Sequence, residues 1–288
     1  MTGPKFTILL PTHNRPDVLA LAVQSVLQQT QTDWELLVVG DGCTDDTATV
    51  VAGFGDARIR WFDLPKGLGF GYANRNLALR QASGALIAFL GHDNLLFPDH
   101  LAKLEVPFRN PDVMLAYSRP LYILDDGLII PYFVNLMLEK PRVAFMSREN
   151  PLPATTVVHR RSCFDTVGYW PEDAAEFGDW LLWKSIMNQF PKGLRLVRQP
   201  TCLHFRATWR DPATWGPAPM QYLKSINAAR RWYPRELHLG LNPQSTPQAQ
   251  VSAMLARDAE GFVRTTRAAV DHLQDSLAWN ACNDPNFQ

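Results

Sequence analysis

Residues 6–47 read FTILLPTHNRPDVLALAVQSVLQQTQTDWELLVVGDGCTDDT, and the architecture follows from this stretch. Two short apolar runs, Phe6–Leu10 and Glu35–Val39, are rich in Ile, Leu and Val and are bounded by Pro, Gly or Asp, as strands are. Between them, the segment from Asp17 has apolar residues at helical spacing. A strand, a helix and a second strand in this order predict a βαβ unit with parallel strands.

The same alternation continues to residue 90. Ile59–Phe62 and Leu86–Leu90 are two further predicted strands, and the segments from Asp45 and from Gly71 are predicted helices. We therefore expect an α/β fold with a mainly parallel sheet and helices on both of its faces.

The second half has shorter apolar runs and more helices. The predicted elements are a helix at 98–108, strands at 114–118, 121–124, 128–130 and 155–159, and helices at 162–167, 179–190, 220–232 and 248–277. Asp125-Asp126-Gly127 is a predicted turn between two of these strands. We expect a main domain over 1–215, with halves 1–110 and 111–215, and a helical C-terminal extension over 216–288.

The composition limits the class of protein. The 288 residues are 46% hydrophobic, and Lys plus Arg and Asp plus Glu both number 28, which disfavours nucleic acid as a partner. The four cysteines form no CxxC pair, so we expect a reducing, cytoplasmic location rather than a disulfide framework. The N-terminal apolar run is too short for a signal peptide, and the apolar region after residue 112 is broken by charges and prolines, so no bilayer span is expected.

Ligands of such sheets bind outside the carboxyl ends of the strands. That rule selects residues 11–14, 40–42, 63–66 and 91–93. Asp41 fits two roles equally well, a ligand contact or part of a turn and helix cap. Asp93 fits a ligand of Mg²⁺ or Mn²⁺, with His92 as a second ligand or a hydrogen-bonding group, but alone it fits an Asx turn better.

Three further residues fit both a functional and a structural role. Asp179 lies at a predicted helix start, as a cap or as a general base, with Glu176 as the competing carboxylate. Arg75 is a solvated helical residue or faces the strand ends. His204, followed by Arg206 and Arg210, is a structural residue or meets a metal or a diphosphate.

The GxGxG in the 66–84 segment follows the third strand rather than the first, so it is a loop and not a dinucleotide fingerprint.

Taken in order, these segments resemble an inverting glycosyltransferase of the GT-A fold, family 2, which uses nucleotide-diphosphate sugars. Residues 6–47 resemble the family's opening nucleotide-binding unit. ANRNLALRQASGALIAFLGHDN resembles its Arg-Asn helix and the strand that enters a DxD-type motif, and VVHRRSCFDTVGYW followed by GDWLLW resembles its acceptor-side segment. The spacing in HDNLLFPDHL and FGDWLLW is similar to the spore coat polysaccharide synthesis type.

The resemblance implies a role for each motif residue. The implied nucleotide-sugar site consists of Pro11, Thr12, Asn14, Asp41, Arg75, His92 and Asp93. Within it, Thr12 and Asp41 would contact the base, and Arg75 would support the base and the diphosphate. Asp93 and His204 would hold a divalent metal, Mn²⁺ or Mg²⁺, and Asp179 would deprotonate the acceptor hydroxyl.

The chain departs from the family's pattern at three positions. Gly40 stands where the family has the first acidic residue of VVDDGS, Gly91 or His92 where it has an Asp before the metal-binding Asp, and Gly178 where it often has a Glu. The alternative hypothesis is therefore a weakly active or inactive relative that binds nucleotide or glycan.

The expected partners follow from the resemblance. They are a nucleotide-diphosphate sugar, with uridine as the expected nucleoside and thymidine or guanosine as alternatives, and a glycan, lipid-linked or other hydroxyl acceptor. Three roles of the C-terminal helices are compatible with the sequence: packing on the domain, a homodimer contact, or contact with a membrane-bound acceptor. Peripheral contact with the inner face of the membrane fits a cytoplasmic protein.

Overall fold

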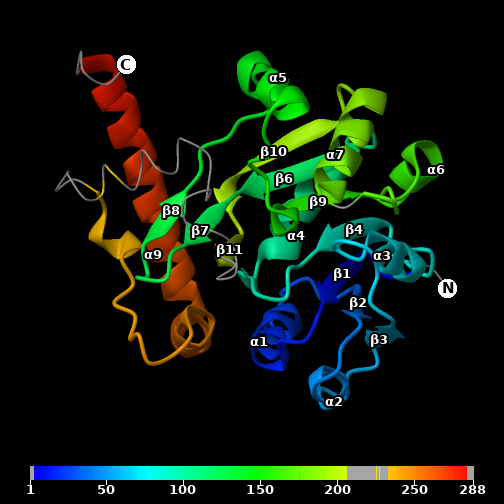
Figure 1. Ribbon diagram of the computed structural model, residues 1–288. Coiled ribbons are helices and arrows are strands. Elements are labelled where there is room, and N and C mark those ends of the chain that lie inside the picture. The colour runs from blue at the N-terminus through cyan, green and yellow to red at the C-terminus, as the bar shows by residue number, and fades with distance from the viewer. Residues whose placement is uncertain (1–2, 175, 206–224, 226, 228–232, 284–288) are drawn as a thin grey trace.

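The structure is a computed structural model, and it describes residues 3–174, 176–205, 225, 227 and 233–283. Its centre is a seven-stranded sheet in the order β10-β6-β9-β4-β1-β2-β3 (Figure 1). The strands are β1 (Phe6–Thr12), β2 (Trp34–Asp41), β3 (Ile59–Leu64), β4 (Leu86–Phe89), β6 (Leu115–Arg119), β9 (Val157–Arg160) and β10 (Leu194–Pro200). All run parallel except β9, which is antiparallel to both of its neighbours. The predicted α/β class with a mainly parallel sheet is confirmed.

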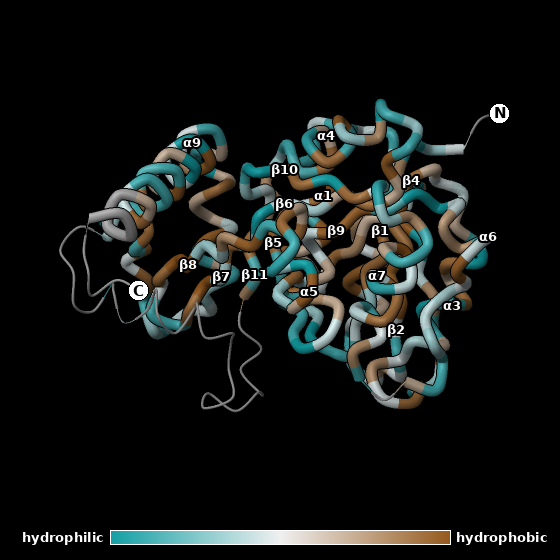
Figure 2. Tube along the Cα trace, turned by 90° about the horizontal axis from the view of Figure 1, so that it is seen from above, coloured by the Kyte–Doolittle hydropathy of each residue, from teal (hydrophilic) through white to brown (hydrophobic). Residues whose placement is uncertain are grey.

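Alternate residues of the central strands supply two hydrophobic cores, one on each face. Ile8 and Leu10 of β1 pack in the core that contains α1 (Pro16–Leu27) and α4 (His100–Glu105), whereas Leu9 packs with α3 (Tyr72–Leu79) and α7 (Gly178–Gln189). This two-sided burial explains why β1 and β2 contain runs of consecutive apolar residues. Figure 2 shows hydrophobic segments in the interior around β1 and β9.

A second sheet has the order β5-β11-β7-β8. Its strands are β5 (Leu95–Leu96), β11 (Cys202–Phe205), β7 (Leu121–Ile123) and β8 (Ile129–Pro131). The predicted turn between β7 and β8 is present, with Gly127 at φ 85°, a conformation that favours glycine.

The long helix α9 (Pro247–Asn283) lies beside β7 and β8 (Figure 1) and has a kink at Asp258. Its buried residues Val251, Val270 and Leu273 belong to the same core as the second sheet. Among the described helices, none is both long and apolar enough to cross a bilayer.

The remaining helices are short. They are α2 (Thr47–Ala52), the 3-10 helix η1 (Val106–Arg109), α5 (Glu139–Ser147), η2 (Ala154–Thr156), α6 (Cys163–Val167) and η4 (Arg235–Leu237). The helix predicted over 98–108 is divided into α4 and η1, because Pro107 has no amide hydrogen for the helical ladder. The helix predicted over 220–232 lies outside the described residues, apart from two positions. The domain limits at residues 110 and 215 stay predictions.

Candidate active site

The four stretches selected from the sequence lie at one edge of the main sheet. β1, β2, β3 and β4 are parallel, so residues after Thr12, Asp41, Leu64 and Phe89 all follow carboxyl ends. The register places Thr12 beside Gly40 and Asp41 beside Leu64. Side chains from segments far apart in the sequence therefore meet at this edge.

Thr12 connects the first of these loops to the fourth. Its buried hydroxyl donates to the carbonyl of Asn14 at 2.9 Å and lies 3.1 Å from Nδ1 of His92. Asn14 has φ 57°, and its side-chain oxygen accepts from the amide of Thr44 at 2.9 Å. Pro11, one residue earlier, pairs with Val39 inside the sheet. The predicted residues Pro11, Thr12, Asn14 and His92 thus lie together.

Asp41 is buried and holds the loop that follows β3. Its Oδ1 accepts from the amide of Gly67 at 2.7 Å and from Nδ2 of Asn74 at 2.6 Å, and its Oδ2 is paired with Lys66. Burial raises the pKa of the Asp41 carboxyl, but the hydrogen bonds from Lys66, Gly67 and Asn74 and the Lys66 charge together hold it below its usual range. Gly71 is at φ 69°, and a Cβ there would lie 2.7 Å from the Asp41 carboxyl group.

Lys66 and Asn74 were not identified from the sequence. Their partner Asp41 precedes them by 25 and 33 residues, and no local pattern gives the path of the loop between them. The one signal was the glycine spacing after Lys66, because glycines permit the close approach of this loop to a carboxylate.

Gly40 is explained by its neighbour on β3. A Cβ atom at this position would lie 2.3 Å from Cη2 of the Trp61 indole. The space that the family's first acidic side chain would occupy is therefore filled by Trp61.

Arg75 and Asp179 come from different halves of the chain and form an ion pair. Nη1 of Arg75 lies 3.4 Å from Oδ1 of Asp179, and the two side chains are 13% and 27% exposed. The guanidinium lies over the rings of Tyr72 and Trp170, with its central carbon 4.8 Å and 5.4 Å from their centroids. Arg75 thus faces the strand ends rather than solvent.

The surroundings of Asp179 change its proton affinity. Burial raises the pKa of its carboxyl above the usual range, and the charge of Arg75 opposes this only in part. Its neighbour Gly178 donates its amide to the Tyr72 hydroxyl at 2.9 Å, and a Cβ there would lie 2.6 Å from the Tyr72 ring. A Glu at position 178 does not fit beside this ring. The competing carboxylate, Glu176, is exposed.

The turn after β4 holds His92 and Asp93. It is closed by a hydrogen bond from the amide of Asn94 to the carbonyl of Gly91 at 3.0 Å, and Asn94 itself is buried and donates to Thr155 at 2.8 Å. Burial, followed by the charges of Arg15 and Arg75, lowers the pKa of His92, although Asp93 acts in the opposite direction. Asp93 is half-buried, and its carboxylate has no hydrogen bond or ion pair with the described part of the chain.

His204 lies on β11, next to this turn. Leu203 pairs with Leu95 of β5, and the amide of Phe205 donates to Oδ1 of Asn94 at 3.1 Å. The His204 ring meets that of Tyr122 edge to face, with centroids 5.1 Å apart. Arg206 and Arg210 lie outside the described residues. Among the described residues, no group of three or more His, Cys, Asp or Glu side chains is arranged to hold a metal ion.

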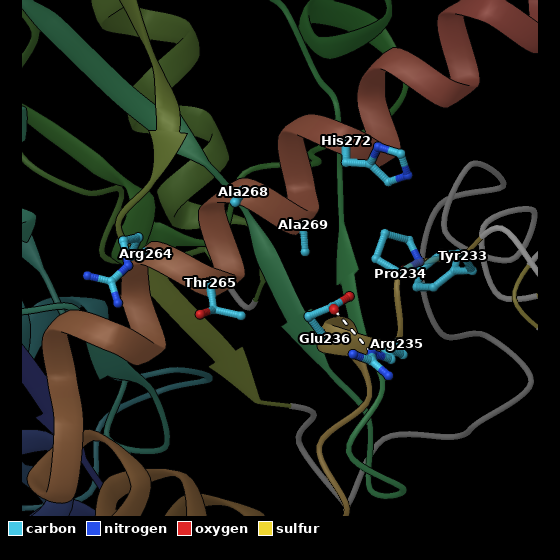
Figure 3. Close-up of a pocket in the computed structure, with 9 residues that line it drawn as sticks. All are labelled: Tyr233, Pro234, Arg235, Glu236, Arg264, Thr265, Ala268, Ala269 and His272. Atoms are coloured by element: carbon cyan, nitrogen blue, oxygen red, sulfur yellow. Dashed lines mark hydrogen bonds and ion pairs between the residues drawn. The ribbon is translucent and has the colours of Figure 1, made fainter.

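An open groove of about 830 Å³ lies elsewhere, between η4 and α9 (Figure 3). Arg264 and His272 line it from α9, and Arg235 and Glu236 form an ion pair at its other side. Its lining residues come from 233–236 and from α9 rather than from the loops at the strand ends, so it does not belong to the site described above.

Sequence comparisons identify the family and two named relatives. A model described as Glycosyl transferase family 2 matches residues 7–164. Protein CgeD of Bacillus subtilis is 29% identical over 209 residues, which are 66% of this chain and 47% of that protein. The Escherichia coli UDP-Glc:alpha-D-GlcNAc-diphosphoundecaprenol beta-1,3-glucosyltransferase WfgD is 38% identical over 129 residues, 44% of this chain and 50% of that protein. This chain spans about half the length of both, and neither name specifies the spore coat type, which stays a prediction.

Solved structures share the fold at low sequence identity. TarS 1-349 of S. aureus, in complex with UDP-GlcNAc, has a TM-score of 0.59 at 18% identity and covers 91% of this chain and 74% of its own. The mannosyltransferase PcManGT of Pyrobaculum calidifontis, in complex with GDP-Man and Mn2+, has a TM-score of 0.52 at 18% identity and covers 98% and 76%. With a family model matched over more than half of its length, this chain belongs to glycosyl transferase family 2, and its structure has the GT-A fold.

Proposed function

We propose that this chain transfers a sugar from a uridine-diphosphate donor, with inversion, to a sugar hydroxyl of a polyprenyl-diphosphate-linked acceptor. The observation that carries the proposal is the ion pair of Arg75 and Asp179 at the edge where His92 and Asp93 lie. A half-buried carboxylate beside a cluster of anion-binding and metal-binding side chains fits a general base next to a diphosphate.

The donor half of the site is built by β1, β2 and the loop after β3. Thr12, Asn14 and His92 line the position proposed for the nucleotide. Because the Asp41 carboxylate is already bonded to Lys66, Gly67 and Asn74, its main role is to hold the loop at residues 65–71. A direct contact between Asp41 and a base would require Lys66 to release Oδ2.

The residues present fit a metal that is bound mostly by the donor. Mg²⁺ and Mn²⁺ are often held by one or two carboxylates plus substrate phosphates, and the Asp93 carboxylate is uncommitted within the described chain. A bound metal would neutralise the charge that develops on the departing diphosphate.

Asp179 is the proposed base. Its carboxylate would accept the proton of the acceptor hydroxyl as that oxygen bonds to the anomeric carbon and the bond to the diphosphate breaks. Because burial raises the pKa of Asp179, the carboxylate accepts a proton more readily than one in water, and the charge of Arg75 acts in the opposite direction by favouring the ionised form.

The acceptor class is supported by the surface beside the base. Phe177, Leu138 and Val143 are 60%, 57% and 56% exposed. The Phe177 ring meets that of Trp180 at 6.1 Å, and Trp180 meets Phe145 of α5 at 6.3 Å, so Phe177 borders an aromatic cluster that reaches α5. Val143 belongs to the same helix, and Leu138 immediately precedes it. WfgD is named for an acceptor on diphosphoundecaprenol, and an apolar surface next to the base suits the first isoprene units of such a lipid.

The experiment that tests the proposal compares Asp179→Asn with Glu176→Gln. With UDP-sugars, Mn²⁺ and a short polyprenyl-diphosphate-linked sugar, Asp179→Asn should lower kcat by about 10² to 10⁴, the usual contribution of a general base. UDP binding, measured by calorimetry, should be unchanged. Glu176→Gln removes the neighbouring exposed carboxylate and should leave kcat within about twofold. An Asp179→Asn protein as active as the parent would show that the base is misassigned.

The alternative, a binding protein without transferase activity, is motivated by the glycines at positions 40, 91 and 178. A thermal-shift screen of nucleotide sugars with and without Mn²⁺ separates the two hypotheses. A transferase of this kind should be stabilised more by donor with metal than by donor alone. Equal stabilisation, with no transfer or donor hydrolysis, would favour the binding protein.

A further inference from the structure

The hydrogen bonds of Thr12 determine which nitrogen of His92 carries a proton. The Thr12 hydroxyl has one hydrogen and lies 2.9 Å from the Asn14 carbonyl and 3.1 Å from His92 Nδ1. A carbonyl oxygen accepts only, so the hydroxyl must donate to Asn14. The second contact is then a hydrogen bond only if Nδ1 is the donor. This is the single assignment that makes both bonds.

The neutral imidazole of His92 therefore presents a lone pair at Nε2. Within the described chain, Nε2 has no hydrogen-bond partner, and the atom is not sealed from solvent. The charges that act on this ring are those of Asp93, Arg15, Arg75 and His13, so it lies among the groups of the proposed diphosphate site. A metal-binding histidine typically has its other nitrogen fixed by a hydrogen bond, as Thr12 fixes Nδ1 here.

Gly91 shows why the usual carboxylate is missing from this turn. A Cβ at position 91 would lie 2.7 Å from Nδ2 of Asn94 and 3.1 Å from Oδ1 of Asp93. Asn94 cannot easily yield, because it is buried and bonded to Thr155 and to the amide of Phe205. An acidic side chain at position 91 is therefore excluded by the packing of the turn.

We propose that Nε2 of His92 and the carboxylate of Asp93 together bind the divalent metal, the imidazole replacing the second carboxylate of the family's motif. This assignment rests on the proposed function and adds a ligand to it. Imidazole is a poor ligand for Mg²⁺ and a good one for first-row transition metals, so the site should prefer Mn²⁺ to Mg²⁺.

The test measures metal affinity rather than turnover. Free Mn²⁺ is followed by electron paramagnetic resonance at saturating UDP, with Mg²⁺ affinity obtained by competition. His92→Ala and His92→Gln should each weaken Mn²⁺ binding about tenfold or more, whereas Mg²⁺ binding should change less. His272→Ala is the control, because His272 is an exposed histidine of α9 that lies outside the strand-end site. It should change Mn²⁺ affinity less than about twofold.

A second variant separates a ligand from a residue that only shapes the turn. His92→Asp supplies an oxygen ligand in place of nitrogen, so the preference for Mn²⁺ over Mg²⁺ should fall by about tenfold. A purely structural role would weaken both metals equally and leave their ratio unchanged, which would overturn the proposal. Unchanged Mn²⁺ affinity in His92→Ala and His92→Gln would do the same and leave the transferase intact. If the wild-type protein bound no Mn²⁺ in the presence of UDP, the metal dependence of the proposed function would itself be wrong.

Discussion

Phe177 has a backbone conformation that its residue type disfavours. Its φ is 63° and its ψ is 15°, in the left-handed region, where a residue with a Cβ costs about 1–2 kcal/mol relative to the right-handed helix. The ring is 60% exposed, so burial returns little of this cost. Strain of this kind persists mainly at functional sites, and Phe177 lies two residues before the proposed base.

Replacing Phe177 by glycine should therefore increase the stability of the fold while weakening the binding of the acceptor. Phe177→Gly should raise the free energy of unfolding by about 1 kcal/mol, because glycine adopts positive φ without strain. The KM for a lipid-linked acceptor should rise at the same time, with donor hydrolysis unchanged. Urea unfolding and steady-state kinetics check the two effects.

Phe177→Ala is the control, since alanine keeps the strained Cβ but lacks the ring. It should share the acceptor defect without the gain in stability. An acceptor KM that is equal in all three proteins would show that the ring does not contact the acceptor.

The sequence predicted which carboxylates lie at the strand ends, but not which side chains they bond. Asp41 and Asp93 were placed correctly because the carboxyl ends of parallel strands share one edge. The bonds of Asp41 to Lys66 and Asn74 depend on the three-dimensional path of a glycine-containing loop, which has no periodic signal. The contact between Trp61 and Gly40 could not be inferred from the sequence either, because it depends on the register of β2 and β3.

Among the secondary-structure elements, the long periodic ones were predicted well and the pairings of short ones were not. The helix expected over 248–277 is present within α9, and the turn at Asp125-Asp126-Gly127 joins β7 and β8 as expected. The second sheet, however, pairs Leu95 with Leu203, which are far apart in the sequence. A two-residue strand such as β5 carries too few residues for an alternation pattern, so its partner could not be inferred.

Arg267 forms polar contacts between α9 and the elements of the main sheet. Arg267 is 14% exposed and donates to both carboxylate oxygens of Asp99, at 2.7 and 2.8 Å, and to the carbonyl of Pro200 at 2.9 and 3.0 Å. A paired, forked contact of this kind is stronger than an exposed ion pair. It ties the helix to the start of α4 and the end of β10.

Arg267→Met should therefore destabilise the fold by about 2 kcal/mol, because it removes the side-chain donor of the Pro200 carbonyl and leaves Asp99 with only the ion pair to Lys103 at 3.6 Å. Arg264→Met, almost one turn away on the same helix, is the control. Arg264 is 73% exposed and its partner Glu260 is 92% exposed, so its loss should change stability by less than about 0.5 kcal/mol. Equal effects of the two substitutions in urea unfolding would mean that Arg267 does not anchor α9.

Across the whole molecule, one hydrophobic core extends from the main sheet to the C-terminal helix. It includes Leu37 of β2, Trp183 of α7, Ile129 of β8 and Leu273 of α9. We therefore expect the parts of the chain that share this core to unfold together rather than in separate steps. The sequence indicated apolar residues in each segment but could not show that they fill one core, because that depends on how the two sheets are placed.

Two buried histidines lie within these packed regions, and both are neutral in the folded state. His100 is 1% exposed and His159 is 0% exposed, and burial lowers the pKa of each to about 4. His159 packs against Phe89, Phe164 and Trp183, and its Nε2 has no hydrogen-bond partner. Protonation would place an unpaired charge among these rings.

The fold should therefore lose stability as the pH falls from about 6.5 towards 4. An unfolded histidine titrates near pH 6.5, so in this window the unfolded state binds more protons than the folded state. Each histidine should lower the free energy of unfolding by up to about 1.4 kcal/mol per pH unit. The carboxylates with lowered pKa values, Asp41 and Asp99, lose their contribution mainly below about pH 5, as carboxyl groups titrate there.

The substitution His159→Phe separates the contribution of His159 to the pH dependence of stability from that of His100. Phenylalanine suits the aromatic surroundings and takes up no proton, so the loss of stability between pH 6 and pH 5 should be smaller by about 1 kcal/mol than in the parent. Urea unfolding at pH 7.5, 6 and 5 measures this slope, and His272→Gln, an exposed histidine of α9, should leave it unchanged. If His159→Phe showed the same slope as the parent, His159 would not be the group whose protonation opposes folding.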